Sequence, residues 1–242
     1  MTRIFLYGMD KEARTLTLTG KDSVHVASAL RMCPGEPIVI CDGAGTDAEC
    51  EIESAAPERT VCRVLRIKPS PSELPVRIHL YQSLPKGDKM EFIIQKTTEL
   101  GVSRIIPVLS DRCISRPDNK AFEKKLVRYR DICREAAQQC GRGVIPEIAG
   151  MTSFSNAVAS LPDGAVKIFC NEDEKVIHIK AALRGIKSGD VHVFIGPEGG
   201  YSGAEKARAK DAGMISVTFG ERILRCETAP VYVCSVMSYE FG

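Results

Sequence analysis

One segment combines a strand end, several glycines and a helix start, a combination that brings the backbone close to a ligand. Residues 194–205 read FIGPEGGYSGAE. The apolar run ends at Gly196, and Ser202 with Glu205 forms a capping box that predicts a helix start. Parallel sheets bind ligands at the carboxyl ends of their strands. The pattern matches neither the dinucleotide nor the P-loop fingerprint, so it predicts a ligand loop or a plain glycine-rich turn.

A second segment places two arginines after another strand end. Residues 218–233 read TFGERILRCETAPVYV, with Arg222 and Arg225 just before an apolar helix. Arginines at the edge that carries the glycine loop can hold an anionic substrate or stabilise a developing negative charge. Surface ion pairs with Glu221 and Glu227 are the alternative, and the residues alone favour it.

A third segment is a basic, amide-rich helix end at residues 134–143, REAAQQCGRG. Gln138, Gln139 and Arg142 can contact RNA or can cap an ordinary helix, and the spacing favours the cap. The four histidines are scattered, and no His, Cys and carboxylate cluster has metal-ligand spacing. We therefore expect no metal site, and the absence of a G-x-S-x-G elbow leaves a serine nucleophile without support.

The elements that position these segments fall into two domains. Residues 1–70 alternate as short β-like runs separated by Gly, Pro and Asp, interrupted by one helical stretch at residues 25–31. Such a pattern predicts a small barrel. The stretch KPSPSELP (68–75) is typical of a linker. We place a second domain at residues 73–242.

After the linker, apolar runs with strand and helix periodicity alternate, which predicts an α/β domain with a mainly parallel, buried sheet. The predicted strands are 76–84, 102–109, 166–171, 191–196 and 215–220. The predicted helices are 88–101, with Asp88 as N-cap, 119–140, 174–185, 202–212 and 228–241.

Composition excludes several classes of protein. The chain has 242 residues, of which 44% are hydrophobic and 26% charged, so it is neither disordered nor fibrous. The net charge is only +2, although residues 73–145 carry 14 basic and 9 acidic groups. That local excess indicates an anionic partner or a solvated helix face. Ten cysteines without a C-x-x-C pair, no signal peptide and no run of about 20 apolar residues predict a cytoplasmic protein with free thiols.

Several segments together resemble one known family. They are YQSLPKGDKMEFIIQKTTELGVSRIIPVLSDRC (81–113), EAAQQCGR (135–142), IGPEGGYSGAE (195–205) and FGERILRCETA (219–229). They are similar to the bacterial 16S ribosomal RNA uridine-N3 methyltransferases, the RsmE family of the SPOUT class. HVASALRMCPGEPIVICDGAG (25–45) resembles that family's PUA-like barrel. Cys226 departs from the resemblance, because a small residue such as Ala or Thr is expected there.

The resemblance implies an α/β fold: a SPOUT-type, trefoil-knotted, parallel-sheet methyltransferase domain at 73–242, preceded by a PUA-like β-barrel at 1–70. It implies S-adenosylmethionine as cofactor, 16S rRNA in the small subunit or an assembly intermediate as partner, and a homodimer. The apolar face of helix 228–241 is the expected interface, and burial of that helix inside its own knot is the alternative. The residues of this face are Val233, Val236, Met237 and Phe241.

The resemblance also implies roles for individual residues. Arg225 is expected to stabilise the charge that develops on uracil, and Glu198 or Glu227 to take the imide proton. The expected cofactor-binding residues are Asn171, Glu172, Ile195, Gly196, Pro197, Glu198, Gly199, Gly200, Phe219, Gly220, Ile223, Leu224, Arg225, Thr228 and Ala229. The expected RNA-binding residues are Arg3, Arg31, Lys86, Lys89, Arg112, Gln138, Gln139, Arg142 and Arg222.

Two other functions compete with this one. A SPOUT enzyme that methylates a ribose 2′-OH or a tRNA shares the fold, but 2′-OH enzymes usually carry an S-L-N-type motif where this chain reads LRCETA (224–229). A non-catalytic RNA-binding assembly factor explains the barrel and the basic helix, but it leaves two cofactor-like loops unexplained. Uracil N3 lies on the Watson–Crick edge, so a target base must be unpaired or flipped out.

Overall fold

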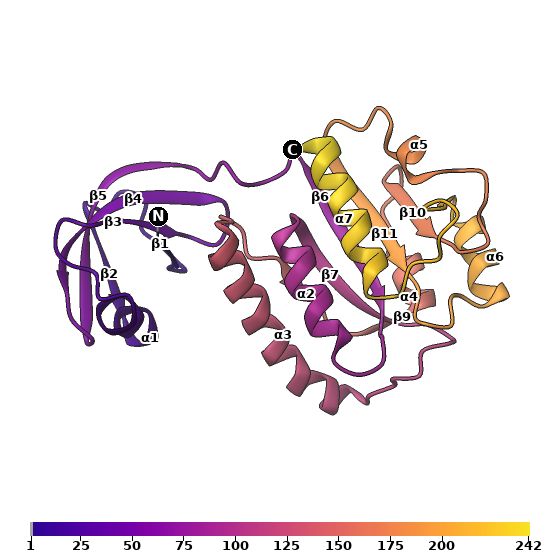
Figure 1. Cartoon of the computed structure of the whole chain (residues 1–242), viewed down its shortest axis with the longest axis horizontal. Coiled ribbons are helices and arrows are strands. Elements are labelled where there is room, and N and C mark those ends of the chain that lie inside the picture. Colours follow the sequence, from indigo (N-terminus) through magenta and orange to yellow (C-terminus); the bar gives the residue numbers. More distant parts are fainter. Residues whose placement is uncertain (1) are drawn as a thin grey trace. The chain divides into compact units, whose positions relative to one another are not determined.

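The computed structural model describes residues 2–242, which form two compact units (Figure 1). The first unit contains the described residues up to Glu73 together with Ala137–Ile145. The second contains Leu74–Ala136 and Pro146–Gly242. Residues 137–145 therefore pack with the part of the chain that precedes the Pro-rich stretch.

The first unit is built on a five-stranded sheet with the order β1-β3-β4-β5-β2. Its strands are β1 Thr2–Phe5, β2 Thr15–Thr19, β3 Pro37–Cys41, β4 Thr46–Ala55 and β5 Arg59–Pro69. β1 and β3 are parallel, and the other pairs are antiparallel. Helix α1 (Gly20–Val24) continues into a π-helical turn at His25–Ala29, so the helical stretch begins earlier than predicted. Gly20, with a φ of 57°, lets the chain turn directly from β2 into the helix.

Alternating side chains of these strands form the core of the first unit. Leu16 and Leu18 of β2 point inward, and Cys50 and Cys62 lie in the same cluster. Burial raises the pKa of Cys50 to about 12 and that of Cys62 to about 11, so both stay protonated and pack as small apolar groups. Within residues 2–242 all ten cysteines are free thiols.

A buried ion pair holds residues 137–145 in the first unit. Arg142 Nη2 donates to Glu73 Oε2 at 2.6 Å, and the arginine side chain is only 4% exposed. Glu73 Oε1 also accepts from the backbone N–H groups of Gly143 (3.1 Å) and Val144 (3.2 Å). A Cβ on Gly143 would lie 2.2 Å from the Ser70 side chain, so this close packing requires glycine. The guanidinium of Arg142 is thus engaged inside the protein, and its contact with RNA stays a prediction.

The second unit is built on a parallel sheet with the order β12-β10-β11-β6-β7-β8, with β9 also paired to β7. Its strands are β6 Val76–Ser83, β7 Val102–Leu109, β8 Glu147–Ile148, β9 Thr152–Ser153, β10 Val166–Cys170, β11 Gly189–Ile195 and β12 Ile215–Val217. Every pairing among them is parallel. The predicted α/β domain with a parallel sheet is confirmed. Strand order does not decide whether the chain is knotted, so the trefoil knot stays a prediction.

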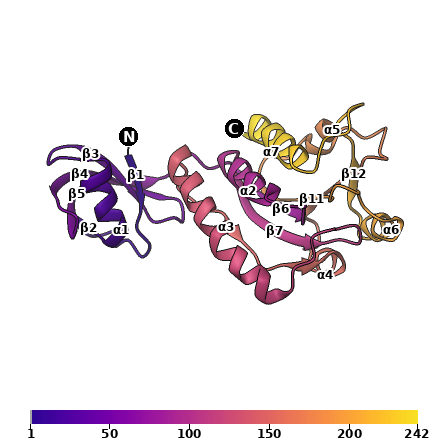
Figure 2. The ribbon, with the colours of Figure 1, turned by 60° about the horizontal axis from the view of Figure 1, so that its bottom comes forward.

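Helices cover both faces of this sheet. They are α2 Lys89–Glu99, α3 Asn119–Cys140, α4 Phe154–Ala159, α5 Ile179–Leu183, α6 Gly203–Asp211 and α7 Thr228–Phe241. Figure 2 shows α2, α5 and α7 on one face and α4 and α6 on the other. Phe154, Phe169, Phe194 and Tyr201 fill the space between the sheet and the second group of helices. This aromatic layer lies directly beneath the carboxyl end of β11.

The segment predicted as a helix over 174–185 is helical only at Ile179–Leu183. Glu174 Oε1 accepts hydrogen bonds from the backbone N–H groups of Lys175, Val176 and Ile177 at 2.8–3.2 Å. A side chain that satisfies the amides of a turn competes with helix formation. The residues after β10 therefore form a loop, which leaves them available at the sheet edge.

The prediction that the apolar face of α7 forms an interface is wrong for the central residues of that face. Val233 and Met237 are 0% exposed, because α7 packs against β6 and α2 of its own chain. Val236 and Phe241 are half-buried. The other side of the helix presents Tyr239, which is 89% exposed. Any association through α7 has to use that outer side.

A row of ionisable side chains crosses four neighbouring strands of the second sheet. Lys167, His192, His79 and Arg104 are successive register partners on β10, β11, β6 and β7. The rings of His79 and His192 stack with centroids 4.6 Å apart, and Tyr81 Oη lies 3.2 Å from His192 Nδ1. His192 is only 4% exposed. Burial, with the neighbouring positive charges, lowers the pKa of His192 to about 4.

We expect this histidine to make the protein sensitive to mild acid. Folded His192 binds its proton near pH 4, whereas an unfolded histidine does so near 6.5, so unfolding takes up a proton between these values. The free energy of unfolding should therefore fall by about 3 kcal/mol as the pH drops from 6.5 to 4. His192→Phe should remove this part of the slope in urea unfolding followed across that range. Equal slopes for the variant and the parent would contradict the assignment.

Candidate ligand-binding site

A cavity of about 540 Å³ lies at the carboxyl ends of β10, β11 and β12. Its size falls within the range of about 300–1,000 Å³ that is usual for small-molecule sites. Most of its walls come from three segments: the end of β10, the loop after β11 and the chain between β12 and α7. Lys89 of α2 and Ala229 of α7 complete the lining. The two motifs singled out in the sequence therefore meet at one cavity, because parallel strands bring their carboxyl ends to one edge.

Most of the predicted cofactor-binding residues line this cavity. They are Asn171, Glu172, Ile195, Gly196, Pro197, Glu198, Gly199, Gly200, Phe219, Gly220, Ile223, Leu224, Arg225 and Ala229. Thr228 is not among the lining residues, and the roles of all these residues stay predictions. The sequence analysis missed Cys170, Lys175, Val217, Thr218 and Cys226 as lining residues. All five adjoin or closely follow predicted residues, so widening each motif to its neighbours would have found them.

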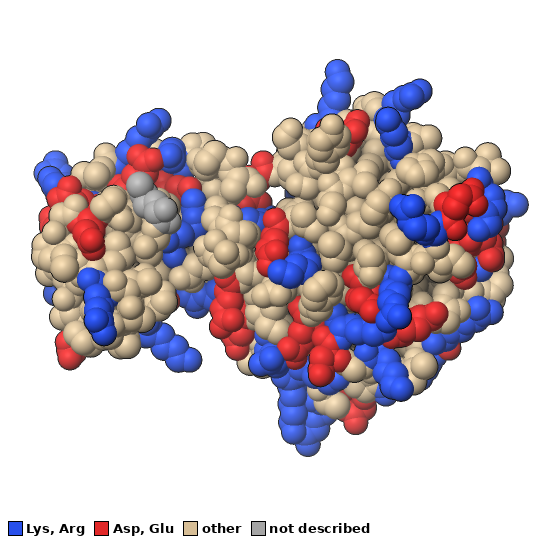
Figure 3. Space-filling view, viewed as in Figure 1, with Lys and Arg blue, Asp and Glu red and all other residues tan. Residues whose placement is uncertain are grey.

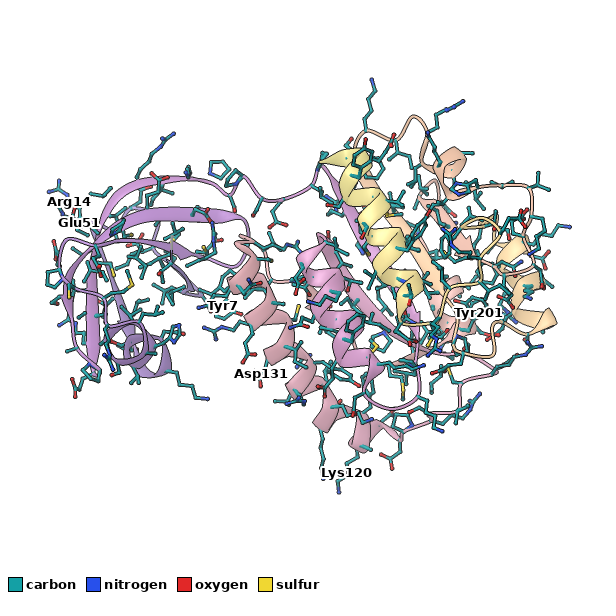
Figure 4. The ribbon with its side chains drawn as sticks, viewed as in Figure 1. Tyr7, Arg14, Glu51, Lys120, Asp131 and Tyr201 are labelled. Carbon is teal, nitrogen blue, oxygen red and sulfur yellow. The ribbon has the colours of Figure 1, made fainter. Side chains whose placement is uncertain are left out.

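The loop after β11 has a shape that requires glycine at one position and favours it at a second. Gly200 has a φ of 67°, and a Cβ there would lie 2.2 Å from Glu172 Oε1. A Cβ on Gly196 would lie 3.2 Å from the ring of Tyr201, which Figure 4 labels. The predicted capping box then starts α6 and is confirmed: Glu205 N–H donates to Ser202 Oγ at 3.2 Å, and Ser202 N–H donates to Glu205 Oε2 at 2.9 Å.

A single lysine joins two carboxylates at the cavity wall. Lys89, the first residue of α2, lies 3.1 Å from Glu198 Oε1 and 3.1 Å from Glu227 Oε2. The thiol of Cys226 lies within the same group, 3.6 Å from Lys89 Nζ and 3.2 Å from Glu227 Oε2. Lys89 was predicted to contact RNA, whereas in this structure its ammonium group links α2, the glycine loop and the start of α7.

This group sets the protonation of its members. Partial burial acts to raise the pKa of Glu198, but hydrogen bonds from the Lys86 and Glu198 amides and from Lys89 outweigh it and lower the pKa to about 2. The pKa of Glu227 is lowered for related reasons, and that of Lys89 is raised by both carboxylates. Burial raises the pKa of Cys226 to about 12. At neutral pH the group therefore holds one cation, two carboxylates and a neutral thiol.

Both arginines of the second motif line the cavity, and neither forms an ion pair. Within residues 2–242, no hydrogen bond or ion pair engages the guanidinium of Arg222 or Arg225. The alternative in which they pair with Glu221 and Glu227 is therefore not what the structure contains. Elsewhere on the surface seen in Figure 3, many Lys and Arg side chains lie beside Asp and Glu side chains. The two cavity arginines are thus cations available to a negatively charged group.

The remaining predicted RNA-binding residues lie outside the cavity lining. Arg3 makes a two-pronged ion pair with Asp47 at 2.7 and 2.9 Å within the first unit. The Arg112 side chain donates to the carbonyl of Gly199 at 2.8 Å. The others in this set are Arg31, Lys86, Gln138, Gln139 and Arg142. Their contact with RNA stays a prediction.

No group of three His, Cys, Asp or Glu side chains within residues 2–242 is placed to hold a metal ion. In the same part of the chain, no helix has both the length and the apolar character to cross a membrane.

Comparison with known proteins assigns both units to families. The sequence profile of the RNA methyltransferase domain matches residues 72–238, and that of the RNA methyltransferase PUA domain matches residues 18–65. The fold and the cavity thus define an RNA methyltransferase with an attached PUA domain, and the predicted PUA-like first domain is confirmed.

Individual relatives show which RNA methyltransferase family the chain is similar to. The chain is 34% identical to ribosomal RNA small subunit methyltransferase E of Bacillus subtilis over 235 residues, 95% of this chain and 92% of that protein. It is also 34% identical to the Mycobacterium bovis protein of that name, over 87% of this chain and 80% of that one. A Neisseria gonorrhoeae structure of the same name, bound to S-adenosyl methionine, superposes with a TM-score of 0.87 at 32% identity and covers 100% of this chain and 98% of that one. The chain belongs to the ribosomal RNA small subunit methyltransferase E family.

We expect Lys89→Gln to disturb the cavity wall through its charge. Without the cation, Glu198 and Glu227 face each other unneutralised, so the pKa of Glu198 should rise above its value of about 2. A carboxylate with a lowered pKa stabilises the folded state at pH values above its pKa in the unfolded chain, and this contribution from Glu198 should become smaller. We therefore expect the free energy of unfolding at pH 7 to fall by about 1–2 kcal/mol. Carboxyl titration by NMR and urea unfolding measure the two effects. Lys86→Gln is the control, because Lys86 reaches Glu198 through its backbone N–H.

Proposed function

We propose that this protein transfers a methyl group from S-adenosylmethionine to N3 of a uridine in 16S ribosomal RNA. Family membership supports action on small-subunit rRNA, and the Neisseria gonorrhoeae relative is bound to the proposed donor. The observation that carries the proposal is the cavity itself: a glycine loop for close backbone contact faces two unpaired arginines, Arg222 and Arg225. One side suits a small organic cofactor, and the other suits an anionic substrate.

The cavity fits the proposed cofactor in size and in chemistry. Apolar side chains supply surfaces for a flat base: Ile195 and Val217 from the ends of β11 and β12, and Leu224 from the chain before α7. Asn171 and Glu172 offer polar atoms suited to ribose hydroxyl groups. Gly196 and Gly200 keep the backbone bare at the loop, so its N–H and C=O groups can reach a ligand directly.

S-adenosylmethionine, when bound, supplies a methyl group already activated as part of a sulfonium. The protein therefore needs no covalent nucleophile, and its residues act by position and electrostatics. Uracil N3 must lose its imide proton, which spreads negative charge over O2 and O4. We assign Arg225 to that charge, because its guanidinium lies at the cavity without an internal partner.

The two carboxylates are weak bases in this setting. A general base works best with a pKa near the working pH, whereas the pKa of Glu198 is held at about 2 by its hydrogen bonds. Lys89 also lowers the proton affinity of Glu227. We therefore assign both carboxylates chiefly to holding Lys89, with Glu227 as a relay for the proton through water. Stabilisation of the imide anion by Arg225 then becomes the larger part of catalysis.

The substrate and its setting complete the proposal. N3 lies on the Watson–Crick edge, so the target uridine has to be unpaired or flipped when it enters the cavity. The PUA domain supplies further RNA contact, for which Arg31 of the first unit is a candidate. An rRNA substrate and ten free thiols suit a cytoplasmic enzyme. The trefoil knot in the second unit belongs to the same proposal.

We also propose that the enzyme is a homodimer joined through the outer face of α7. Tyr239 is almost fully exposed, and Val231 and Tyr232 are half-buried on the same side of the helix. An exposed aromatic side chain beside partly exposed apolar ones is typical of a protein contact. Light scattering should give twice the chain mass, and Tyr239→Glu should shift it toward the monomer. A monomeric parent protein at micromolar concentration would contradict the proposal.

We expect Arg225→Ala to lose most of the methylation rate and to keep its stability and cofactor affinity. The charge on uracil develops only during reaction, so a cation directed at it lowers the barrier more than it strengthens ground-state binding. Removal of one such group typically costs about 10²–10³-fold in rate. We therefore expect that loss in single-turnover methylation of 30S subunits, with unchanged Tm and cofactor affinity. Arg222→Ala is the matched control, and an equal loss in both variants would assign the effect to shared RNA binding instead.

Mass mapping of 16S rRNA tests the reaction itself. RNA from a strain that lacks the gene should lose one N3-methyluridine, and the purified protein with S-adenosylmethionine should restore it. Loss of a 2′-O-methyl group would replace the proposal with ribose methylation. An unchanged rRNA together with no calorimetric binding of S-adenosylmethionine would leave the non-catalytic assembly factor as the better account.

A further inference from the structure

The loop between β7 and α3 contacts the glycine loop without lining the cavity. Residues 110–113 follow the carboxyl end of β7, next to β6 in the sheet. None of them is among the residues that line the cavity. Three hydrogen bonds nevertheless connect this segment to residues 199–205. The connection needs an explanation beyond cavity lining.

Glu205 makes the first of these links with a carboxylate that is almost fully buried. Its Oε2 accepts from Ser202 N–H at 2.9 Å, which is the bond of an ordinary capping box. Its Oε1 accepts from Asp111 N–H at 2.8 Å, across 94 positions of sequence. The residue is 4% exposed, so neither bond has water as a ready substitute. One carboxylate therefore fastens the start of α6 to the loop after β7.

Arg112 makes a second link directly to the glycine loop. Its Nη1 donates to the carbonyl oxygen of Gly199 at 2.8 Å. A Cβ on Gly199 would lie 3.4 Å from Arg112 Cβ, so the back of the loop rests against this side chain rather than against the cavity. A third link, from the Ser202 hydroxyl to Asp111, adjoins the first.

The loop after β7 is itself braced, which makes it a firm support. Arg116 Nη2 donates to the carbonyl oxygens of Ser110 at 2.8 Å and Asp111 at 2.6 Å, and its Nε donates to that of Cys113 at 3.1 Å. These bonds hold the segment in one conformation on its own side. Arg112 connects this segment to Gly199, and Glu205 connects it to Ser202 at the start of α6.

We propose that Glu205 and Arg112 are positioning residues: through the loop after β7 they hold the glycine loop in the shape that receives the cofactor. This inference rests on the proposed function, because it takes the ligand of that loop to be S-adenosylmethionine. A loop that occupies the binding shape only part of the time lowers the apparent affinity by that fraction. Loss of either residue should therefore weaken cofactor binding without removing any group that touches the cofactor.

The test separates this role from simple capping of α6. Glu205→Gln retains one acceptor oxygen but loses the second, so one of the two fastened amides is left without a partner. Ser202→Ala removes the capping hydroxyl and, with it, the third link to Asp111. It leaves in place the two links that the inference assigns to positioning, Glu205–Asp111 and Arg112–Gly199. Both variants of the full chain should lower Tm by similar amounts. Calorimetry with S-adenosylmethionine should show about 10-fold or greater weakening for Glu205→Gln and less than about threefold for Ser202→Ala.

Arg112 gives a second test at an exposed position, where a failure to fold is not a concern. Arg112→Ala should weaken binding of S-adenosylmethionine several-fold, and Arg112→Lys should restore part of it, because an ammonium group can also donate to the Gly199 carbonyl. With 30S subunits, Glu205→Gln should raise KM for the cofactor and leave kcat at saturation within about threefold.

Each negative outcome points to a different error. Cofactor affinity in Glu205→Gln and Arg112→Ala equal to that of the parent protein would overturn this inference and leave the proposed function intact. Equal weakening in Glu205→Gln and Ser202→Ala would reduce Glu205 to a helix cap and also overturn it. No binding of S-adenosylmethionine by the parent protein would instead refute the proposed function.

Discussion

The loop after β11 has almost no side chains with which to hold itself, and its neighbours supply the missing contacts. Three of residues 196–200 are glycines. Lys89, at the start of α2, holds the loop through Glu198, Arg112 after β7 holds it through a carbonyl, and Glu172 after β10 covers Gly200. A parallel sheet brings all these loops to one edge. The bare backbone that suits a ligand is therefore possible only because this topology surrounds it with supports.

The same arrangement decides which charges remain available at the cavity. Lys89 lies between Glu198 and Glu227 and forms an ion pair with each, so both carboxylates are bonded to the cation of α2. Arg222 and Arg225 have no such partner within the described chain. Their free guanidinium groups suit a negatively charged substrate such as RNA. One lysine at the first position of α2 thus engages both of these acids at the cavity wall.

Local sequence signals predicted the parts of the fold whose causes are local. Apolar periodicity predicted the helix at 119–140, which the structure contains as α3, and Ser202 with Glu205 marked the start of α6. Residues 174–178 were wrongly predicted as part of a helix because the Glu174 side chain accepts hydrogen bonds from the amides that would begin that helix. The apolar stripe on α7 packs against the sheet of its own chain. A dimer interface would require the same residue types at the same spacing, so periodicity alone cannot distinguish the two kinds of burial.

The roles of polar residues depend on partners that no local pattern reveals. Glu205 illustrates this, because one carboxylate oxygen completes a motif three residues long and the other binds a residue 94 positions earlier. Lys89 and Glu198 are 109 positions apart, and Arg142 meets Glu73 across 69. A basic residue in sequence is therefore equally compatible with RNA contact and with an internal ion pair. The fold shows the difference: the guanidinium of Arg225 is free at the cavity, whereas that of Arg142 is bound to Glu73 in the first unit. This difference is the reason why we assign the catalytic role to Arg225.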